Sequence, residues 1–322
     1  MIVVLTGGTG GAKFVEGLLE ASPVENLTFV VNTADDLEWW GLHVSPDLDS
    51  ITYAAAGRLS RERGWGVEGD TFYCLQAMAD LSEPIWFNIG DSDLAVHLIR
   101  SKLLAQGKTL TEATAEICRK LGVKARILPM CNSRVETRID TPVGELAFQE
   151  YFVKRWYQDP VRSVRFAGAR EAQPAPGVVD AILSASAVLI APSNPVTSIG
   201  PILAVPGIRE ALQETRATVT AVSPIIGNAA VSGPAATLMA AQGLPVSLAG
   251  VAKAYEDFLD LLIADLSDSH RVHQLNGSPV RVHCTGTLMK SMEDKVKLAR
   301  TVLQLVSPEN TDQAVSDFSE FP

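Results

Sequence analysis

The most constraining feature of this sequence is its first thirteen residues. An apolar run at 2–5 leads into four glycines, at positions 7, 8, 10 and 11, and an amphipathic segment follows at 12–20. This order predicts a buried strand, a glycine-rich loop and a helix. Such a loop leaves backbone N–H groups free and directs a helix N-terminus at an anion. The pattern therefore predicts a phosphate site at Gly8, Thr9, Gly10, Gly11 and Lys13. A simple tight turn is the alternative.

Two familiar phosphate motifs fit this segment poorly. A P-loop places Ser or Thr after Gly-Lys, whereas here Ala12 precedes Lys13 and Phe14 follows it, so no hydroxyl is placed to hold magnesium. The dinucleotide fingerprint has a third glycine where Lys13 stands, and an acid at the end of the second strand. The second apolar run, at 27–31, ends instead in Asn32. An NAD-dependent oxidoreductase is therefore a disfavoured alternative.

Composition excludes several classes of protein. The chain has 322 residues, 47% of them hydrophobic, and a formal net charge of -10. An acidic chain argues against general nucleic-acid binding, which depends on Lys and Arg neutralising phosphates. The four cysteines form no CxxC pair, the histidines no H-x-x-x-H pair, and a zinc site is not expected. With neither a signal peptide nor a convincing membrane span in the sequence, we expect a cytoplasmic protein that does not bind a membrane.

Short apolar runs alternate with helical segments along most of the chain. Further runs lie at 85–89, 187–191, 217–222 and 246–251. This alternation predicts an α/β fold with a Rossmann-like, three-layer parallel sheet, whose ligands bind at the carboxyl ends of the strands. The expected helices cover residues 50–63, 71–80, 92–106, 111–121, 207–215, 234–242, 252–265 and 290–305.

One segment departs from this pattern. Apolar and polar residues alternate at 134–139 and again at 145–149, with Thr-Pro-Val-Gly at 141–144 as the turn between them. Such alternation is typical of antiparallel hairpins. We therefore interpret 133–170 as a small, mostly antiparallel β subdomain inserted into a Rossmann-like nucleotide-binding domain made of 1–132 and 171–306. The acidic segment 307–322 is expected to be a mobile tail.

Acidic residues recur in pairs near the predicted strand ends. The pairs lie at 35–36, at Asp47 and Asp49, and at Asp91 and Asp93. Carboxylates beside a phosphate site are typical ligands of magnesium, and one of them can also orient a hydroxyl nucleophile. Helix capping and turn formation are the alternative roles. Three pairs beside one phosphate loop favour a metal or substrate role.

Nine motifs, in the same order, resemble those of one family. They include GGTGGAK at 7–13, SPDLD at 45–49, GDSDLAVH at 90–97 and PSNPVTSIGP at 192–201, and the others lie at 31–36, 65–72, 127–130, 223–228 and 232–235. On these motifs the chain resembles the 2-phospho-L-lactate transferases (CofD, called FbiA in actinobacteria) of coenzyme F-420 biosynthesis. The resemblance covers residues 1–305.

The resemblance implies a defined reaction. A phospho-acid moiety (phospholactyl, phosphoenolpyruvyl or 3-phosphoglyceryl) passes from a GMP-activated diphosphate donor to the ribityl hydroxyl of the deazaflavin Fo, and GMP is released. Mg²⁺ is the expected cofactor, and a homodimer is the expected assembly. Transfer of this kind depends on positioning and charge neutralisation more than on covalent chemistry.

The resemblance also implies roles for particular residues. The glycine loop with Lys13, Asn32, Ser193 and Asn194 would hold the diphosphate and the nucleotide. Asp49 matches a position that contacts Fo. We predict Asp49 and Asp91 as catalytic residues, and Asp49, Asp91 and Asp93 as magnesium ligands. Ser92 stands where many relatives have a basic residue that contacts Fo, so binding of Fo or of the donor is expected to differ here.

A second class of protein remains as an alternative. YvcK-like proteins share the glycine loop and bind nucleotide sugars without this chemistry. The motifs at 45–49 and 193–201 favour the transferase. The sequence does not choose between the three phospho-acids.

Overall fold

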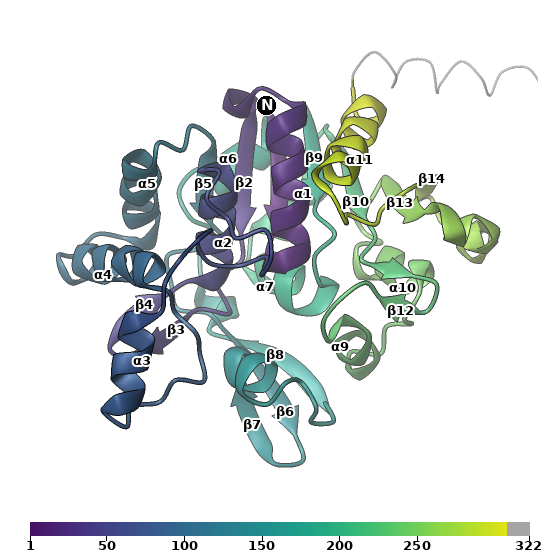
Figure 1. The fold of residues 1–322 in the computed structure, drawn as a ribbon. Coiled ribbons are helices and arrows are strands. Elements are labelled where there is room, and N and C mark those ends of the chain that lie inside the picture. Colours follow the sequence, from purple (N-terminus) through teal and green to yellow (C-terminus); the bar gives the residue numbers. More distant parts are fainter. Residues whose placement is uncertain (308–322) are drawn as a thin grey trace, which may run out of the picture.

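A seven-stranded parallel sheet forms the centre of the molecule (Figure 1). The structure, a computed structural model, describes residues 1–307, so the predicted mobile tail lies outside the described residues apart from Ser307. Across the sheet the strands run in the order β14-β13-β10-β9-β1-β2-β5. Their bounds are β1 Ile2–Thr6, β2 Leu27–Val31, β5 Arg126–Pro129, β9 Ala187–Ile190, β10 Thr218–Val222, β13 Leu261–Asp265 and β14 Arg281–Thr285.

Helices cover both faces of this sheet. Successive strand residues point to opposite faces, so Val3 and Leu5 enter one hydrophobic core and Val4 the other. The core around Val4 is covered by α1 (Gly8–Ala21), α2 (Pro46–Ala55), α4 (Asp91–Ala105), α5 (Leu110–Leu121) and α11 (Met292–Leu305). The other core is covered by α6 (Val178–Leu183), α7 (Gly200–Ala204), α8 (Ile208–Glu214), α9 (Ala235–Ala241) and α10 (Leu248–Ala254). The predicted three-layer α/β fold is confirmed.

The order of the strands predicts where a ligand binds. From β1 the chain crosses through α1 to β2 on one side, whereas β9 lies against β1 on the other side. The strand order therefore reverses between β1 and β9. In open parallel sheets, ligands bind outside the carboxyl ends of the strands at such a reversal. The glycine loop follows β1 there, and the loop 191–194 follows β9.

The segment 133–170 forms the expected antiparallel structure. Strands β6 (Glu136–Thr141), β7 (Gly144–Ala147) and β8 (Ser163–Ala167) pair in the order β7-β6-β8. Apolar side chains of this sheet join the core on the face of the central sheet that α6 to α10 cover. The division of the chain into domains therefore stays an interpretation. Two short hairpins, β3 (Leu37–Trp39) with β4 (Leu42–Val44) and β11 (Ile225–Ile226) with β12 (Ala229–Ala230), complete the strands of the described residues.

The strand predicted at 85–89 is wrong. This apolar run is an extended connection after α3 (Tyr73–Asp80), and its aromatic rings pack against the β3–β4 hairpin. The ring centroids of Trp39 and Trp86 lie 4.6 Å apart in an edge-to-face arrangement. The strand that continues the central sheet beyond β2 is β5, which has only four residues and was not predicted. An apolar run of this length does not by itself specify a strand, and in this one Ile89 is buried whereas Ile85 is 43% exposed.

Two further predictions are wrong near the C-terminal half of the sheet. The strand predicted at 246–251 is largely α10, whose N-terminus is capped by the Ser247 hydroxyl. The helix predicted at 252–265 ends early, and β13 occupies its second part.

The helix predicted at 50–63 begins at Pro46, which suits the first turn of a helix, and ends at Ala55. In the described part of the chain, no helix combines the length and apolarity that crossing a membrane requires.

Candidate functional site

The glycine loop lies directly against the loop that follows β9. A Cβ atom built on Gly10 would stand 2.5 Å from the carbonyl oxygen of Pro192, and one on Gly11 would stand 2.7 Å from Ser193 Oγ. The Ser193 hydroxyl donates a hydrogen bond of 2.7 Å to the carbonyl oxygen of Gly7. Gly10 and Gly11 are thus required because the two loops approach closely. Gly8 is required for a different reason, because its backbone adopts the left-handed conformation (φ 67°). The structure brings the predicted glycine loop and Ser193 together.

Three polar side chains lie beneath the first turn of α1. The Asn32 amide nitrogen is 3.0 Å from Asp35 Oδ2, 3.0 Å from Asp47 Oδ2 and 3.2 Å from the carbonyl oxygen of Thr197. The backbone N–H of Gly8 donates to Asp47 Oδ1 over 2.8 Å. Asn32 therefore links the carboxyl end of β2 to α2 and to the turn after β9, as expected of a residue that shapes the site.

Asp35 and Asp47 form a buried acidic pair that has no basic partner. They are 5% and 8% exposed, and neither forms an ion pair with Lys, Arg or His within residues 1–307. Burial, followed by the charge of Asp47, raises the pKa of Asp35 well above its usual range. Burial also raises the pKa of Asp47 to about 6, against hydrogen bonds from Asn32 and Gly8. Asp35 Oδ1 is buried without a hydrogen-bond partner. A cation bound between the two carboxylates would lower the free-energy cost of burying their negative charges.

This pair leads to a pH-dependent prediction for the metal-free protein. With a folded-state pKa of about 6, Asp47 ionises in the unfolded chain at a lower pH than in the folded protein. The free energy of unfolding therefore falls as pH rises from about 4 to about 6, by up to about 3 kcal/mol. Asp47→Asn removes this charge and retains an acceptor for Gly8. We expect the variant to gain about 1–2 kcal/mol over the wild type at pH 7.5 and nothing near pH 4. Urea unfolding in EDTA at both pH values measures this, and an equal difference at both would contradict it.

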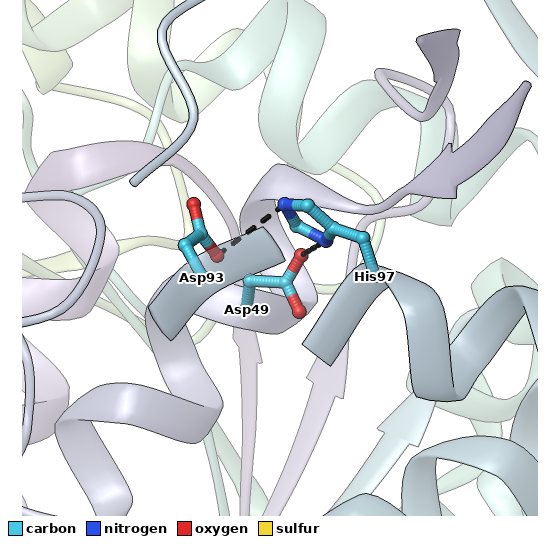
Figure 2. Close-up of side chains that lie close together, drawn as sticks. All are labelled: Asp49, Asp93 and His97. Atoms are coloured by element: carbon cyan, nitrogen blue, oxygen red, sulfur yellow. Dashed lines mark ion pairs between the residues drawn. The ribbon is translucent and has the colours of Figure 1, made fainter. Parts of the chain in front are cut away.

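A second buried group contains two of the predicted acids. Ligand atoms of Asp49, Asp93 and His97 all lie within 4.8 Å of one another (Figure 2). His97 lies between the carboxylates, with Nδ1 3.5 Å from Asp49 Oδ2 and Nε2 3.3 Å from Asp93 Oδ1. Arg100 donates from Nη1 to Asp49 Oδ2 over 3.1 Å and from Nη2 to Asp49 Oδ1. The Tyr53 hydroxyl donates to Asp93 Oδ1 over 2.6 Å.

These contacts make the second group a compensated network. Burial opposes ionisation of Asp93, but the nearby His97 ring and the hydrogen bond from Tyr53 outweigh it, and the pKa of Asp93 is lowered. Both oxygens of Asp49 already face a guanidinium group. Magnesium prefers oxygen ligands, whereas here a histidine and an arginine stand inside the cluster. The proximity of Asp49 and Asp93 agrees with the predicted magnesium site, but ligation by these residues stays a prediction.

Asp91 lies apart from Asp49 and Asp93 in this arrangement. It accepts hydrogen bonds from the Thr71 hydroxyl at 2.5 Å and from the backbone N–H groups of Tyr73 and Cys74 at 3.0 and 2.9 Å. Asp91 therefore caps α3, although it belongs to the first turn of α4. In return, Asp70 accepts from the N–H groups of residues 92 and 93 at 2.8 and 3.1 Å and caps α4. Each acid caps the other's helix.

The reciprocal capping predicts the effect of Asp91→Ala. Two N–H groups of α3 would lose their acceptor, and α3 has no buried residue to stabilise it otherwise. We expect a loss of about 1–2 kcal/mol of local stability and faster hydrogen exchange in α3, with the rest of the fold unchanged. Hydrogen exchange followed by mass spectrometry measures this. Unchanged exchange in α3 would show that the caps are unimportant, and a loss of turnover beyond that of Asp70→Ala would support the predicted catalytic role of Asp91.

The remaining predicted residues lie around the same edge of the sheet. Thr9 is exposed and Lys13 is half-buried on α1, and Lys13 has no ion pair within residues 1–307. Asn194 Oδ1 accepts from the N–H of Val196 at 2.9 Å, so this side chain shapes the turn after β9. Ser92 is exposed at the first turn of α4. Contacts of these residues with a ligand stay predictions.

Sequence reasoning missed several residues of the second group. His97 and Arg100 lie four and seven residues after Asp93, which places all three on one face of a helix. That spacing was a readable signal, because three polar residues on the buried face of an otherwise apolar helix need partners. Tyr53 and Asp70 gave no comparable signal. Two surface pockets occur elsewhere, one on the face of α11 and one between β8, α7, α8 and the end of α10, so neither coincides with the glycine loop.

Fold and site together define a doubly wound α/β protein with a glycine loop at the reversal of strand order. The fold is similar to that of a member of the upf0052 family from Bacillus halodurans, with a TM-score of 0.63 and 16% identity over 94% of this chain and 98% of that one. At this identity the similarity concerns the fold alone.

The sequence comparisons identify the family. The profile described as 2-phospho-L-lactate transferase CofD matches residues 2–299. A 2-phospho-L-lactate transferase of Methanosarcina mazei is 43% identical over 305 residues, which cover 94% of this chain and 99% of that protein. A phosphoenolpyruvate transferase of Streptomyces griseus is 39% identical over 310 residues, covering 94% and 98%. The chain belongs to the CofD family of 2-phospho-L-lactate transferases, enzymes of coenzyme F-420 biosynthesis.

Proposed function

We propose that this enzyme transfers a phospho-acid moiety from a GMP-activated diphosphate donor to the ribityl hydroxyl of the deazaflavin Fo and releases GMP. The observation that carries the proposal is the nearly full-length similarity to CofD transferases. The position of the glycine loop at the reversal of strand order supports it, because that is where a doubly wound fold binds phosphates. In the reaction the hydroxyl oxygen bonds to the distal phosphorus while the bond from that phosphorus to GMP breaks.

The donor would bind along the edge formed by β1 and β9. The first turn of α1 presents backbone N–H groups, and Lys13 adds a positive charge in the second turn. Asn32 and the Ser193-Asn194 turn hold the neighbouring loops in place through their hydrogen bonds. These groups suit a diphosphate, which is recognised by several donors at fixed positions.

Magnesium is the cofactor we propose, and Asp35 with Asp47 fits it better than the predicted acids. The two carboxylates lie beside the phosphate loop, have no basic partner and leave Asp35 Oδ1 unpaired. Bound there, the ion would neutralise charge on the diphosphate. The Asp49 group, in contrast, already contains Arg100 and His97. The protein itself would hold the donor at α1. Asp35 and Asp47 would bind the ion, and Asp49 would be left to act on the substrate.

Asp49 is proposed to orient the hydroxyl of Fo. It lies in the first turn of α2, two residues after Asp47, and is 4% exposed. Ser92, at the start of α4, is proposed to adjust binding of Fo or of the donor, since a basic residue is absent there. Asp49→Asn is expected to lower turnover about a hundredfold, in the range found for positioned acid–base groups.

The experiment that tests the proposal is a single-turnover assay. Purified protein, Mg²⁺ and Fo are mixed separately with the lactyl, enolpyruvyl and glyceryl forms of the GMP-linked diphosphate, and products are identified by mass spectrometry. A phospho-acid adduct of Fo with stoichiometric GMP would support the transferase, and the fastest donor would identify the acid. Guanine nucleotide binding without product from any donor would favour the YvcK-like alternative. The names of the relatives differ in the acid, so the donor itself stays open.

A further inference from the structure

We propose that Arg100 is a positioning residue for the transfer reaction, which it serves by clamping the Asp49 carboxylate in one orientation. The inference rests on the proposed function, because it assigns Asp49 to the hydroxyl of Fo. The contacts of Arg100 carry it. Its guanidinium group donates to both oxygens of Asp49, and Nη1 also lies 3.4 Å from the carbonyl oxygen of His43.

The clamp belongs to a ladder of polar contacts between α2 and α4. On α4, residues 93, 97 and 100 lie on one face, and on α2 Asp49 and Tyr53 lie one turn apart. The rungs are Arg100 with Asp49, His97 between both acids, and Tyr53 with Asp93. The ladder therefore fixes the first turn of α2, which carries Asp47 and Asp49, relative to the first turn of α4, which carries Ser92.

The cost of this arrangement argues for a role beyond packing. Arg100 is 2% exposed, His97 is 1% exposed, and two acids are buried with them. Apolar side chains of similar volume would join two helices at least as stably, because charges lose their hydration on burial. A bidentate guanidinium–carboxylate pair, in contrast, fixes the plane and direction of the carboxylate, which apolar packing leaves free. A carboxylate that must meet a hydroxyl group in one geometry requires this control.

The expected kinetic effect falls on turnover and spares donor binding. The diphosphate is proposed to bind at α1, and Arg100 contacts neither α1 nor the loop after β9 in any recorded hydrogen bond of residues 1–307. A loosened Asp49 would leave the donor bound while the hydroxyl is poorly aligned. A misplacement of about 1 Å in such a site costs roughly a hundredfold in rate.

Four variants test the inference with the same substrates, in steady-state assays that give kcat and KM. Arg100→Lys keeps the charge but loses the bidentate geometry, and Arg100→Ala leaves a space that added guanidinium ion can fill. Arg119→Lys is the matched control, because Arg119 also forms a bidentate pair, with Glu116 on the surface of α5. His97→Gln is a second probe of the ladder in case Arg100→Ala fails to fold.

For both Arg100 variants and His97→Gln we expect kcat to fall about tenfold to a hundredfold while the KM for the donor changes less than about threefold. Arg119→Lys should match the wild type. Millimolar guanidinium should raise the rate of Arg100→Ala at least about tenfold over its rate without guanidinium.

Wild-type turnover in folded Arg100→Lys, or a folded Arg100→Ala whose loss guanidinium does not relieve, would overturn the inference. Should Arg100→Ala not fold, unchanged kcat in both Arg100→Lys and His97→Gln would overturn it. If the wild type itself forms no product, the proposed function fails and this inference fails with it. An active wild type beside unaffected variants would reject the positioning role alone.

Discussion

Replacing Asp35 by Asn is expected to lower turnover about a hundredfold or more and to remove the stabilisation of the protein by Mg²⁺. Asp35 is the more strongly perturbed member of the acidic pair beside the phosphate loop, and its Oδ1 atom has no partner. Without a cation the charge is costly where it is, so Asp35→Asn should be at least as stable as the wild type in EDTA. A catalytic loss combined with equal or greater stability separates a functional acid from a structural one.

The measurement combines kcat with the shift in Tm between EDTA and millimolar Mg²⁺. Asp36→Asn is the neighbouring control, because Asp36, unlike Asp35 and Asp47, has a basic partner within the described residues: it pairs with His43 at 3.0 Å and accepts from the Ser45 hydroxyl at 2.6 Å. It should keep its response to Mg²⁺. If Asp35→Asn retains the full Mg²⁺ shift, the ion binds elsewhere, and the Asp49 and Asp93 carboxylates become the first alternative.

Replacing Gly10 by Ala is expected to weaken binding of a guanine nucleotide at least about thirtyfold, which corresponds to about 2 kcal/mol. The new methyl group would stand 2.5 Å from the carbonyl oxygen of Pro192. The Cβ atom is fixed to the backbone of α1 and the oxygen belongs to the backbone of the loop after β9, so these two segments must move apart. They are the two halves of the proposed diphosphate site. In an ordinary helix, Gly→Ala stabilises by about 1 kcal/mol, so any loss comes from this contact.

Titration calorimetry with GDP and thermal unfolding check this second expectation. Gly286→Ala is the control, because a Cβ atom there meets nothing within 4 Å. Unchanged nucleotide affinity in a folded Gly10→Ala protein would show that the diphosphate does not bind between α1 and the loop after β9. A lowered Tm with unchanged affinity would confine the role of Gly10 to packing.

Local features of the fold were predictable because their signals are local. The strand, glycine loop and helix at the N-terminus are as expected, and so is the β6–β7 hairpin around its turn at 141–144. Thr109 caps α5 in a capping box, which a threonine three residues before a glutamate indicates. The errors fall on apolar runs, such as 85–89 and 246–251, whose length and hydrophobicity do not distinguish a strand from a helix or a loop.

The sequence placed several candidate site residues at one edge of the sheet, and the structure brings them together there, whereas their ligands stay predictions. The glycine loop, Asn32 and Ser193 follow strands whose carboxyl ends meet at one edge, so any parallel arrangement brings them together. The acids were harder to rank. Asp35, Asp49 and Asp91 look alike in sequence, yet within residues 1–307 the first has no basic partner and one oxygen without a hydrogen bond, the second faces an arginine and the third caps a helix.

By itself, then, the sequence determined the parallel sheet, the strand, glycine loop and helix at the N-terminus, and the family, because these depend on neighbouring residues and on motif order. Only the tertiary structure decided what each carboxylate does. Asp49 meets Arg100 across 51 positions, and Asp70 meets the first turn of α4 across more than 20. The chemistry of a carboxylate depends on its burial and on the charges within a few ångströms, and those neighbours are set by how α2, α3 and α4 pack.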